Sequence, residues 1–313
     1  MHSFIRWLPG FLSLFGDYNS MMWAYTVTKK NELHAQDVDS QKELERTIKE
    51  ANWMWLDAMQ PDELEFEIIQ NFVKEPRILE EIKKKKSISR PEKVNGFIFF
   101  SVSQAIYTGK LHVSPVYVLT KTSGIFITIR SKSSSQAFKN ALKTFEDCVG
   151  KVCEGDMNSL FILSRLFHEL TNENLDTLMD IREFIDSLEQ KALENPGNKE
   201  ISRSVFATKR MISTLERVLW SQREQMLNIR EGVVLSIKAT EEIETTLNFA
   251  INNISRELSL LTSENYALDS ILSLQDLGLI HRVEKRLILL SFLALLVSIL
   301  IILLEIDIMS LLG

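Results

Sequence analysis

Residues 287–304 read LILLSFLALLVSILIILL. This run of 18 residues contains no charged residue, no proline and no glycine. An α-helix rises about 1.5 Å per residue, so a helix of this length is about 27 Å long, close to the roughly 30 Å hydrocarbon core of a bilayer. Buried helices of soluble domains are seldom apolar on every side over such a length. The run therefore predicts a transmembrane helix over 287–304.

The charged residues around this run predict its orientation. Four basic side chains precede it, at His281, Arg282, Lys285 and Arg286. Two acidic side chains follow it, at Glu305 and Asp307. Because basic residues stay on the cytoplasmic side, we expect a single-pass protein of the cell membrane whose large N-terminal part is cytoplasmic. The nine residues 305–313 are expected to be a short outer tail, too short for a second span.

Composition narrows the possible functions. The formal net charge is −6, whereas a general nucleic-acid binder is normally basic, so we expect no nucleic-acid partner. Cys148 and Cys153 lie close together without further cysteines, which is typical of a reduced cytosolic pair. The sequence has no Ser-His-Asp, HExxH, Walker or GxGxxG pattern. We therefore expect neither an enzyme nor an organic cofactor.

The segment 22–155 has a mixed pattern that predicts an α+β fold. Strands are expected at 53–59 and in an antiparallel meander of three runs, 94–107, 111–120 and 124–130. Helices are expected from Ser40, from Pro61-Asp62-Glu63, from Glu75-Pro76 and over 134–148. These elements predict a cytoplasmic α/β/α domain, in which helices cover a mixed or antiparallel sheet. Residues 1–21 form an uncertain N-terminal extension, either an interfacial anchor or an over-long start.

After this domain, the segment 156–231 predicts a helical hairpin. Its turn is Asn195-Pro196-Gly197-Asn198, and the return helix, 199–230, is rich in basic residues. The first helix carries an acidic stripe with helical spacing, made of Glu169, Glu173, Asp176, Asp180 and Glu183. The stripe is interpreted as a solvated or salt-bridged face, with a cation-attracting surface as the alternative.

The segment 232–286 predicts one long stalk helix that leads into the apolar run. It contains no proline, and Gly278 is its only interior glycine. Apolar residues recur with helical spacing from Leu247 to Leu272. Because one chain cannot bury so long a helix alone, we expect the stalk to self-associate as a coiled coil.

Four stretches resemble the CorA family of magnesium and divalent-cation channels. They are WLDAMQPDELEFEIIQNF, EPRILEEIKKKKSISRPEKV, the strand 124–130, and the hairpin and stalk sequences that include NENLDTLMDIREFIDSLEQKAL and SLQDLGLIHRVEKRL. The resemblance covers about residues 22–304. It rests on the order and spacing of the four stretches.

This resemblance implies a homopentamer in which cytoplasmic domains form a funnel and the stalk and span line a pore. Mg²⁺ is then both the transported ion and a regulatory ligand that holds the pore closed. The resemblance places one half of the regulatory site at Glu80 and Glu81. The other half falls near Thr245, beside Glu244.

The chain departs from the family at the outer end of the pore. The family's Gly-Met-Asn motif falls at Glu305-Ile306-Asp307, where five copies would form an acidic ring that attracts cations. Small residues recur on one face of the span, and they are candidates for lining the pore: Ser291, Ala294 and Ser298. Close helix packing through these small residues is the alternative.

Three functions remain open at this stage. The first is passive, channel-type flux of magnesium or another divalent cation. The second is a non-conducting CorA-like paralogue that acts as a membrane-anchored scaffold or regulator. The third is an unrelated tail-anchored coiled-coil protein. A Gly-Met-Asn motif and a second span in a longer gene product would favour the first.

Overall fold

A computed structural model describes residues 21–28, 32–85, 87–88, 91–121, 124–131, 135–152, 159–232 and 239–312. Of residues 21, 135, 145–152 and 302–312, only the backbone is described. The N-terminal extension, up to residue 20, and the side chains of Cys148 and Cys153 lie outside the described part, so their interpretations stay predictions.

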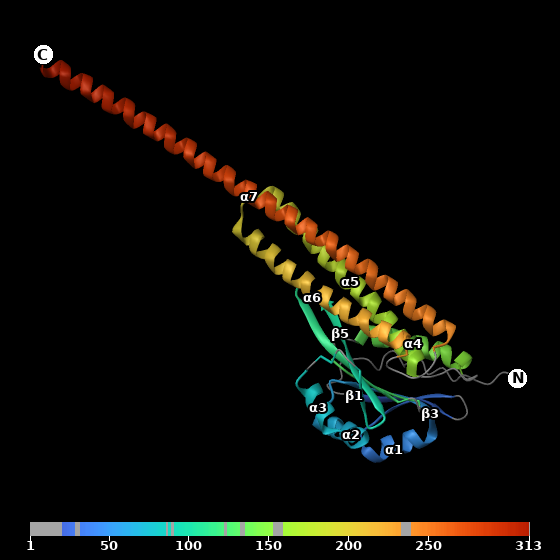
Figure 1. Cartoon of the computed structure of the whole chain (residues 1–313). Coiled ribbons are helices and arrows are strands. Elements are labelled where there is room, and N and C mark those ends of the chain that lie inside the picture. Colours follow the sequence, from blue (N-terminus) through green and yellow to red (C-terminus); the bar gives the residue numbers. More distant parts are fainter. Residues whose placement is uncertain are drawn as a thin grey trace, which may run out of the picture. The chain divides into compact units, whose positions relative to one another are not determined.

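In the first part of the described chain strands and helices are interspersed, and after β7 the described elements are all helices (Figure 1). The strands are β1 (Met21–Thr28), β2 (Leu33–Asp37), β3 (Ala51–Met59), β4 (Glu92–Val94), β5 (Phe97–Tyr107), β6 (Leu111–Lys121) and β7 (Ile125–Arg130). The helices are α1 (Gln41–Glu50), α2 (Glu63–Val73), α3 (Pro76–Lys83), α4 (Ser135–Val152), α5 (Ser159–Glu194), α6 (Lys199–Arg230) and α7 (Glu241–Leu312). The expected α+β class is confirmed.

The seven strands form one mixed sheet with the order β2-β1-β3-β7-β6-β5-β4. The central pair, β3 and β7, is parallel, and all other neighbours are antiparallel. The expected meander is therefore confirmed as β5, β6 and β7. Its first run is interrupted, however: Asn95 and Gly96 have positive φ angles and turn the chain between β4 and β5.

Two of the short helices begin where their sequence predicts. The Ser40 side chain accepts a hydrogen bond from the Glu43 amide at the start of α1. Asp62 and Glu65 form a reciprocal capping box at the start of α2. These caps satisfy amide groups that the first helical turn leaves free.

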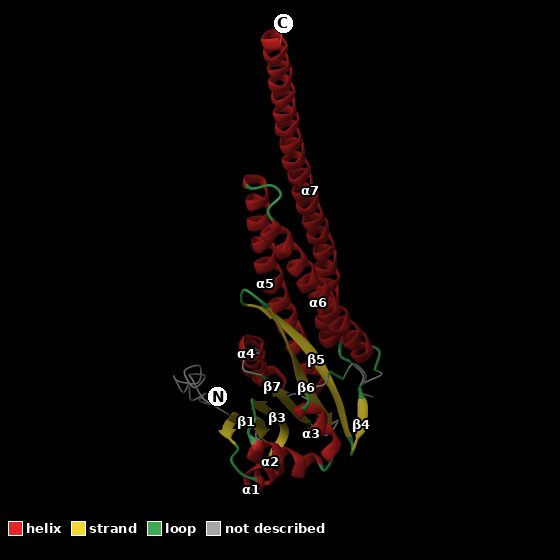
Figure 2. Ribbon diagram, turned by 90° about the vertical axis from the view of Figure 1, so that its left-hand side faces the viewer, coloured by secondary structure: helices red, strands yellow, loops and turns green. Residues whose placement is uncertain are grey.

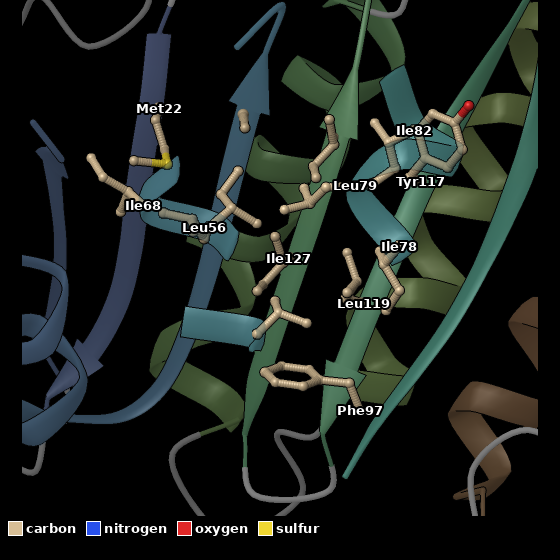
Figure 3. Close-up of a cluster of buried hydrophobic side chains, with 14 of the residues drawn as sticks. Met22, Leu56, Ile68, Ile78, Leu79, Ile82, Phe97, Tyr117, Leu119 and Ile127 are labelled. Carbon is tan, nitrogen blue, oxygen red and sulfur yellow. The ribbon is translucent and has the colours of Figure 1, made fainter. Parts of the chain in front are cut away.

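One face of the sheet packs against α1, α2 and α3 (Figures 1 and 2). Figure 3 shows Leu56 of β3 and Ile127 of β7 facing Ile68 of α2 and Leu79 of α3. Phe97 and Leu119 extend this apolar cluster along the sheet. Each fully buried aliphatic or aromatic side chain contributes about 1.5–3 kcal/mol, which makes this cluster a main source of the domain's stability.

The opposite face of the sheet carries a buried ion pair. Because strand residues alternate between faces, Asp57 and Trp55 lie on the side away from Leu56. Asp57 accepts hydrogen bonds from Arg130 Nε at 3.0 Å and Nη2 at 2.8 Å, and from the Thr128 hydroxyl at 2.7 Å. The Arg130 guanidinium also lies over the ring of Phe138 in α4, 4.3 Å from its centroid. The pair thus joins β3, β7 and α4.

The long helices follow the expected hairpin and stalk. α5 and α6 span 36 and 32 residues, and α7 continues without interruption for 72 residues, about 108 Å at 1.5 Å per residue. The contacts divide the chain into two compact units. The first comprises 1–177 and 215–258, and the second comprises 178–214 and 259–313. The domain boundaries expected from the sequence stay predictions.

Among the helices of the described residues, none combines the length and apolar character that crossing a membrane requires. The transmembrane helix expected over 287–304 is therefore not found in the described part of the chain.

Candidate functional site

An acidic pocket opens between α3 and β4, where the resemblance placed half of a magnesium site. Its volume is about 300 Å³. Its charged lining consists of Glu75, Arg77, Glu81, Glu92 and Lys93. Pro76 starts α3 in the position where a missing N–H costs nothing, and Glu75 precedes it as the N-cap residue. The β4–β5 pairing brings Glu92 to the other side of the pocket.

Arg77 holds the two walls of this pocket together. Its Nε lies 3.6 Å from Glu81 Oε1, and its Nη2 lies 3.0 Å from Glu92 Oε2. A guanidinium therefore occupies the place between two carboxylates that a bound cation would take. A divalent ion here would have to displace Arg77 or share the carboxylates with it, because hard cations need several oxygen ligands.

The side chains of the two predicted ligands, Glu80 and Glu81, lie in different environments. Glu80 is exposed and pairs with Lys84 at 3.3 Å. The Glu81 side chain is only 15% exposed. Burial, together with the negative charge of Glu81, raises the pKa of Tyr117 on β6 to about 12. The structure thus brings Glu81, but not Glu80, into the pocket.

No three His, Cys, Asp or Glu side chains of the described residues gather closely enough to hold a metal ion. Glu244 and Thr245, where the resemblance placed the second half of the magnesium site, are exposed on α7. The assignment of Glu80 and Glu81 as metal ligands stays a prediction.

The C-terminal part of α7 exposes an unusual surface. Between Leu287 and Ile301, all twelve large apolar side chains are at least 44% exposed. The candidate pore residues Ser291, Ala294 and Ser298 are also exposed, and the Ser298 hydroxyl donates to the Ala294 carbonyl at 2.9 Å. The side chains of Glu305 and Asp307 lie outside the described part, so their predicted role stays a prediction.

The acidic stripe of α5 is divided between two environments. Glu173 accepts hydrogen bonds from the Ala137 amide at 2.6 Å and from Gln104, and Glu169 accepts one from Asn140 at 3.1 Å. Ala137 lies in the first turn of α4, so Glu173 caps that helix. Burial raises the pKa of Glu173, and these hydrogen bonds oppose the shift. Asp176, Asp180 and Glu183 are exposed, as a solvated face requires.

Sequence reasoning missed two buried carboxyl groups in the apolar stripe of α7. Glu257 is 2% exposed, and Glu264 is 7% exposed with Arg182 at 3.8 Å. Burial raises the pKa of Glu257 to about 8 and also raises that of Glu264, although Arg182 opposes the second shift. Their helical spacing could have revealed them. The two glutamates are seven residues apart, and they lie on the same helical face as Leu247, Leu261, Leu268 and Ile271.

The fold and these sites define a class of protein: a mixed α+β domain joined to three long helices, the last of which exposes an apolar end. The model of the family described as "CorA-like Mg2+ transporter protein" matches residues 50–299, most of the chain. The chain belongs to this family of divalent-cation transporters. The family consists of membrane transporters that handle Mg²⁺ and not of enzymes.

Solved structures share the fold at low sequence identity. The soluble domain of CorA from Methanocaldococcus jannaschii matches with a TM-score of 0.60 and 13% identity over 82% of this chain and 96% of that chain. The complete CorA magnesium transporter from Methanocaldococcus jannaschii matches with a TM-score of 0.67 and 13% identity over 87% of this chain and 81% of that one. The full-length CmaX protein matches with a TM-score of 0.66 and 13% identity over 88% and 83%. Among curated proteins, no match is found.

Proposed function

We propose that this protein carries magnesium or another divalent cation across the cell membrane, by passive flux through a homopentameric pore. The observation that carries the proposal is the apolar surface of α7 between Leu287 and Ile301. Consecutive apolar residues surround a helix on every side, and a helix of this kind is stable only inside a protein or in lipid. In a family of transporters, lipid and neighbouring copies of the same helix are the natural cover.

In this proposal, the apolar segment 287–304 enters the membrane, and the chain before it is cytoplasmic. The basic residues Lys285 and Arg286 are exposed directly before the segment, on the side where the positive-inside rule keeps them. Five copies then bring Ser291, Ala294 and Ser298 to a common axis. The side chains on this face are the smallest and most polar of the segment.

The acidic residues after the segment supply the outer mouth of the pore. Five copies of Glu305 and Asp307 place ten carboxylates around one axis. Like charges at such distances repel each other unless cations or protons lie among them. The ring therefore raises the local concentration of divalent cations, as acidic rings do in other cation channels.

The acidic pocket of α3 and β4 supplies regulation in this proposal. Glu81 and Glu92 contribute carboxylates, Glu80 offers a third on the outside of α3, and a neighbouring copy completes the oxygen ligands of a regulatory Mg²⁺. The support is the concentration of carboxylates around Arg77. Arg77 balances their charge when no ion is bound.

A second candidate function is that of a non-conducting, membrane-anchored scaffold or regulator. The sequence Glu305-Ile306-Asp307 favours it, because this tripeptide stands where the family has Gly-Met-Asn. The two functions share the same fold and assembly, and they differ only in whether ions pass.

Uptake of magnesium by proteoliposomes tests the proposed function. Vesicles that contain the purified protein and a trapped magnesium-sensitive dye should take up Mg²⁺ faster than empty vesicles. Replacing the ring with Glu305→Gln and Asp307→Asn should lower uptake, most steeply at low ion concentration and low salt, while the mass of the oligomer stays the same. The matched control replaces the exposed pair Asp180→Asn and Glu183→Gln on α5 and should leave uptake unchanged.

Two outcomes would contradict parts of this account. Equal uptake by the ring variant and the wild type at every ion concentration would leave Glu305 and Asp307 without a role. No uptake by the wild type would favour the non-conducting scaffold.

A further inference from the structure

The turn between α5 and α6 contacts α7 directly, one helical turn before the basic residues that precede the apolar segment. Gly197 of the turn and Gly278 of α7 lie backbone to backbone. A Cβ atom added at Gly278 would meet Pro196 C at 2.5 Å and Gly197 N at 2.6 Å. Both neighbours are backbone atoms, so no side-chain rotation relieves the contact. Only glycine fits this position of α7.

Arg282, one turn further along α7, fixes the same turn by hydrogen bonds. Its guanidinium donates to the carbonyl oxygens of Pro196 at 2.8 Å and Gly197 at 3.3 Å, and to Asn195 Oδ1 at 3.1 Å. The last carbonyl groups of a helix lack partners within the helix, and a cation near them is favourable. Arg282 therefore satisfies acceptors just past the C-terminal end of α5 with charge-assisted bonds.

A third contact lies about one helical turn before Gly278 on α7. The buried Gln275 amide donates to the Ala192 carbonyl of α5 at 3.5 Å. Gln275, Gly278 and Arg282 are spaced by three and four residues, so they lie on one face of α7. Glycine inside a helix is unfavourable for the helix itself, which makes the close approach of the turn the reason for its presence.

We propose that Gly278 and Arg282 form a latch that fixes the apolar end of α7 to the α5–α6 turn. The latch consists of Asn195, Pro196, Gly197, Gly278 and Arg282. Because Arg282 stands five residues before the apolar segment, the latch sets where that segment begins relative to the hairpin. Gly278 and Arg282 are then positioning residues for ion transport, and this part of the inference rests on the proposed function.

The direction in which Gly278→Ala changes amide hydrogen exchange distinguishes a docked turn from an undocked one. In a free helix, Gly278→Ala strengthens the helix and slows hydrogen exchange of its amides. With the turn docked, the added methyl group forces the turn away from α7. We expect amides of 195–202 and 276–284 to exchange at least tenfold faster in Gly278→Ala and in Arg282→Gln. Arg282→Lys, which keeps the charge with fewer fixed donors, should lie between Arg282→Gln and the wild type.

The controls are Ser270→Ala on the exposed face of α7 and Arg210→Gln on the exposed face of α6, and both should leave these exchange rates unchanged. The measurement uses the full chain in its oligomeric form, with oligomer mass recorded for every variant. Unchanged or slower exchange in Gly278→Ala would overturn the latch.

Magnesium uptake by proteoliposomes tests the positioning role. We expect uptake to fall at least fivefold in Gly278→Ala and Arg282→Gln, with partial rescue in Arg282→Lys and unchanged oligomer mass. Faster exchange with unchanged uptake would overturn the positioning role. If the wild type shows no uptake, the proposed function and the positioning role both fall, whereas the exchange rates by themselves still decide whether the latch exists.

Discussion

Asp57 and Glu257 show two ways in which this protein buries a carboxyl group. Asp57 accepts hydrogen bonds from both Arg130 and Thr128, so its charge is compensated. Glu257 lies in the apolar stripe of α7, and its Oε2 has no hydrogen-bond partner among the described residues. Desolvation penalises the charged form of such a group, which is why the pKa of Glu257 is raised to about 8.

This raised pKa predicts that Glu257 makes stability depend on pH. Between the ordinary glutamate pKa of 4.5 and the raised pKa of about 8, the folded protein keeps a proton that the unfolded chain releases. The free energy of unfolding therefore falls as the pH rises through this range, by about 5 kcal/mol at most. Glu257→Gln removes the titrating group. We expect the variant and the wild type to be similarly stable at pH 5, and the variant to be more stable at pH 9.

Denaturant unfolding followed by circular dichroism at both pH values measures this difference. The exposed Glu224→Gln on α6 serves as the control and should show the pH dependence of the wild type. A constant difference in stability between Glu257→Gln and the wild type from pH 5 to pH 9 would show that Glu257 keeps an ordinary pKa in the folded protein.

The residues that the sequence predicted correctly act on their immediate neighbours along the chain. Ser40 and Asp62 cap α1 and α2 as expected, because capping depends on residues two or three positions away. Arg77 escaped prediction, since its contact with Glu92 crosses 15 sequence positions and needs the β4–β5 pairing. Glu81 was proposed as a metal ligand only through the resemblance, because a single glutamate on a short helix carries no signal of its own, and this role stays a prediction.

At the scale of elements, long periodic helices were predictable and short edge strands were not. The bounds of α6 agree with the sequence, and α7 is uninterrupted because it contains no proline. β2 and β4 lie at the two edges of the sheet and have only five and three residues. Their side chains are mostly half-buried or exposed, so they lack the apolar alternation that marks a strand.

Helix α4 depends on a cap that comes from another element. Glu173 of α5 accepts the Ala137 amide in the first turn of α4, a role that sequence spacing within α5 does not reveal. Glu173→Ala removes this acceptor and leaves the Gln104 amide without its carboxylate. We expect the free energy of unfolding to fall by about 1–2 kcal/mol.

Thermal unfolding monitored by circular dichroism checks this prediction. Glu183→Ala on the exposed face of α5 is the matched control and should change stability by less than about 0.5 kcal/mol. An equal loss in both variants would show that Glu173 contributes helix propensity and not a cap.

At the scale of the whole molecule, the family assignment and the exposed apolar end of α7 support the same account. The family model spans residues 50–299, and the exposed apolar side chains run from Leu287 to Ile301. The sequence predicted the order of the parts because hydropathy and helical period extend over many residues. It did not predict the latch, since the contact of Gly197 with Gly278 joins positions 81 residues apart.

The central claim is that divalent cations pass through this protein by passive flux. Current through planar bilayers that contain the purified oligomer, recorded under a Mg²⁺ gradient, tests this claim most directly. For a passive path selective for a doubly charged ion, we predict that the reversal potential shifts by about 30 mV for each tenfold change in the Mg²⁺ gradient. A current no larger than that of protein-free bilayers, at every gradient and with the oligomer shown to be present, would contradict the claim.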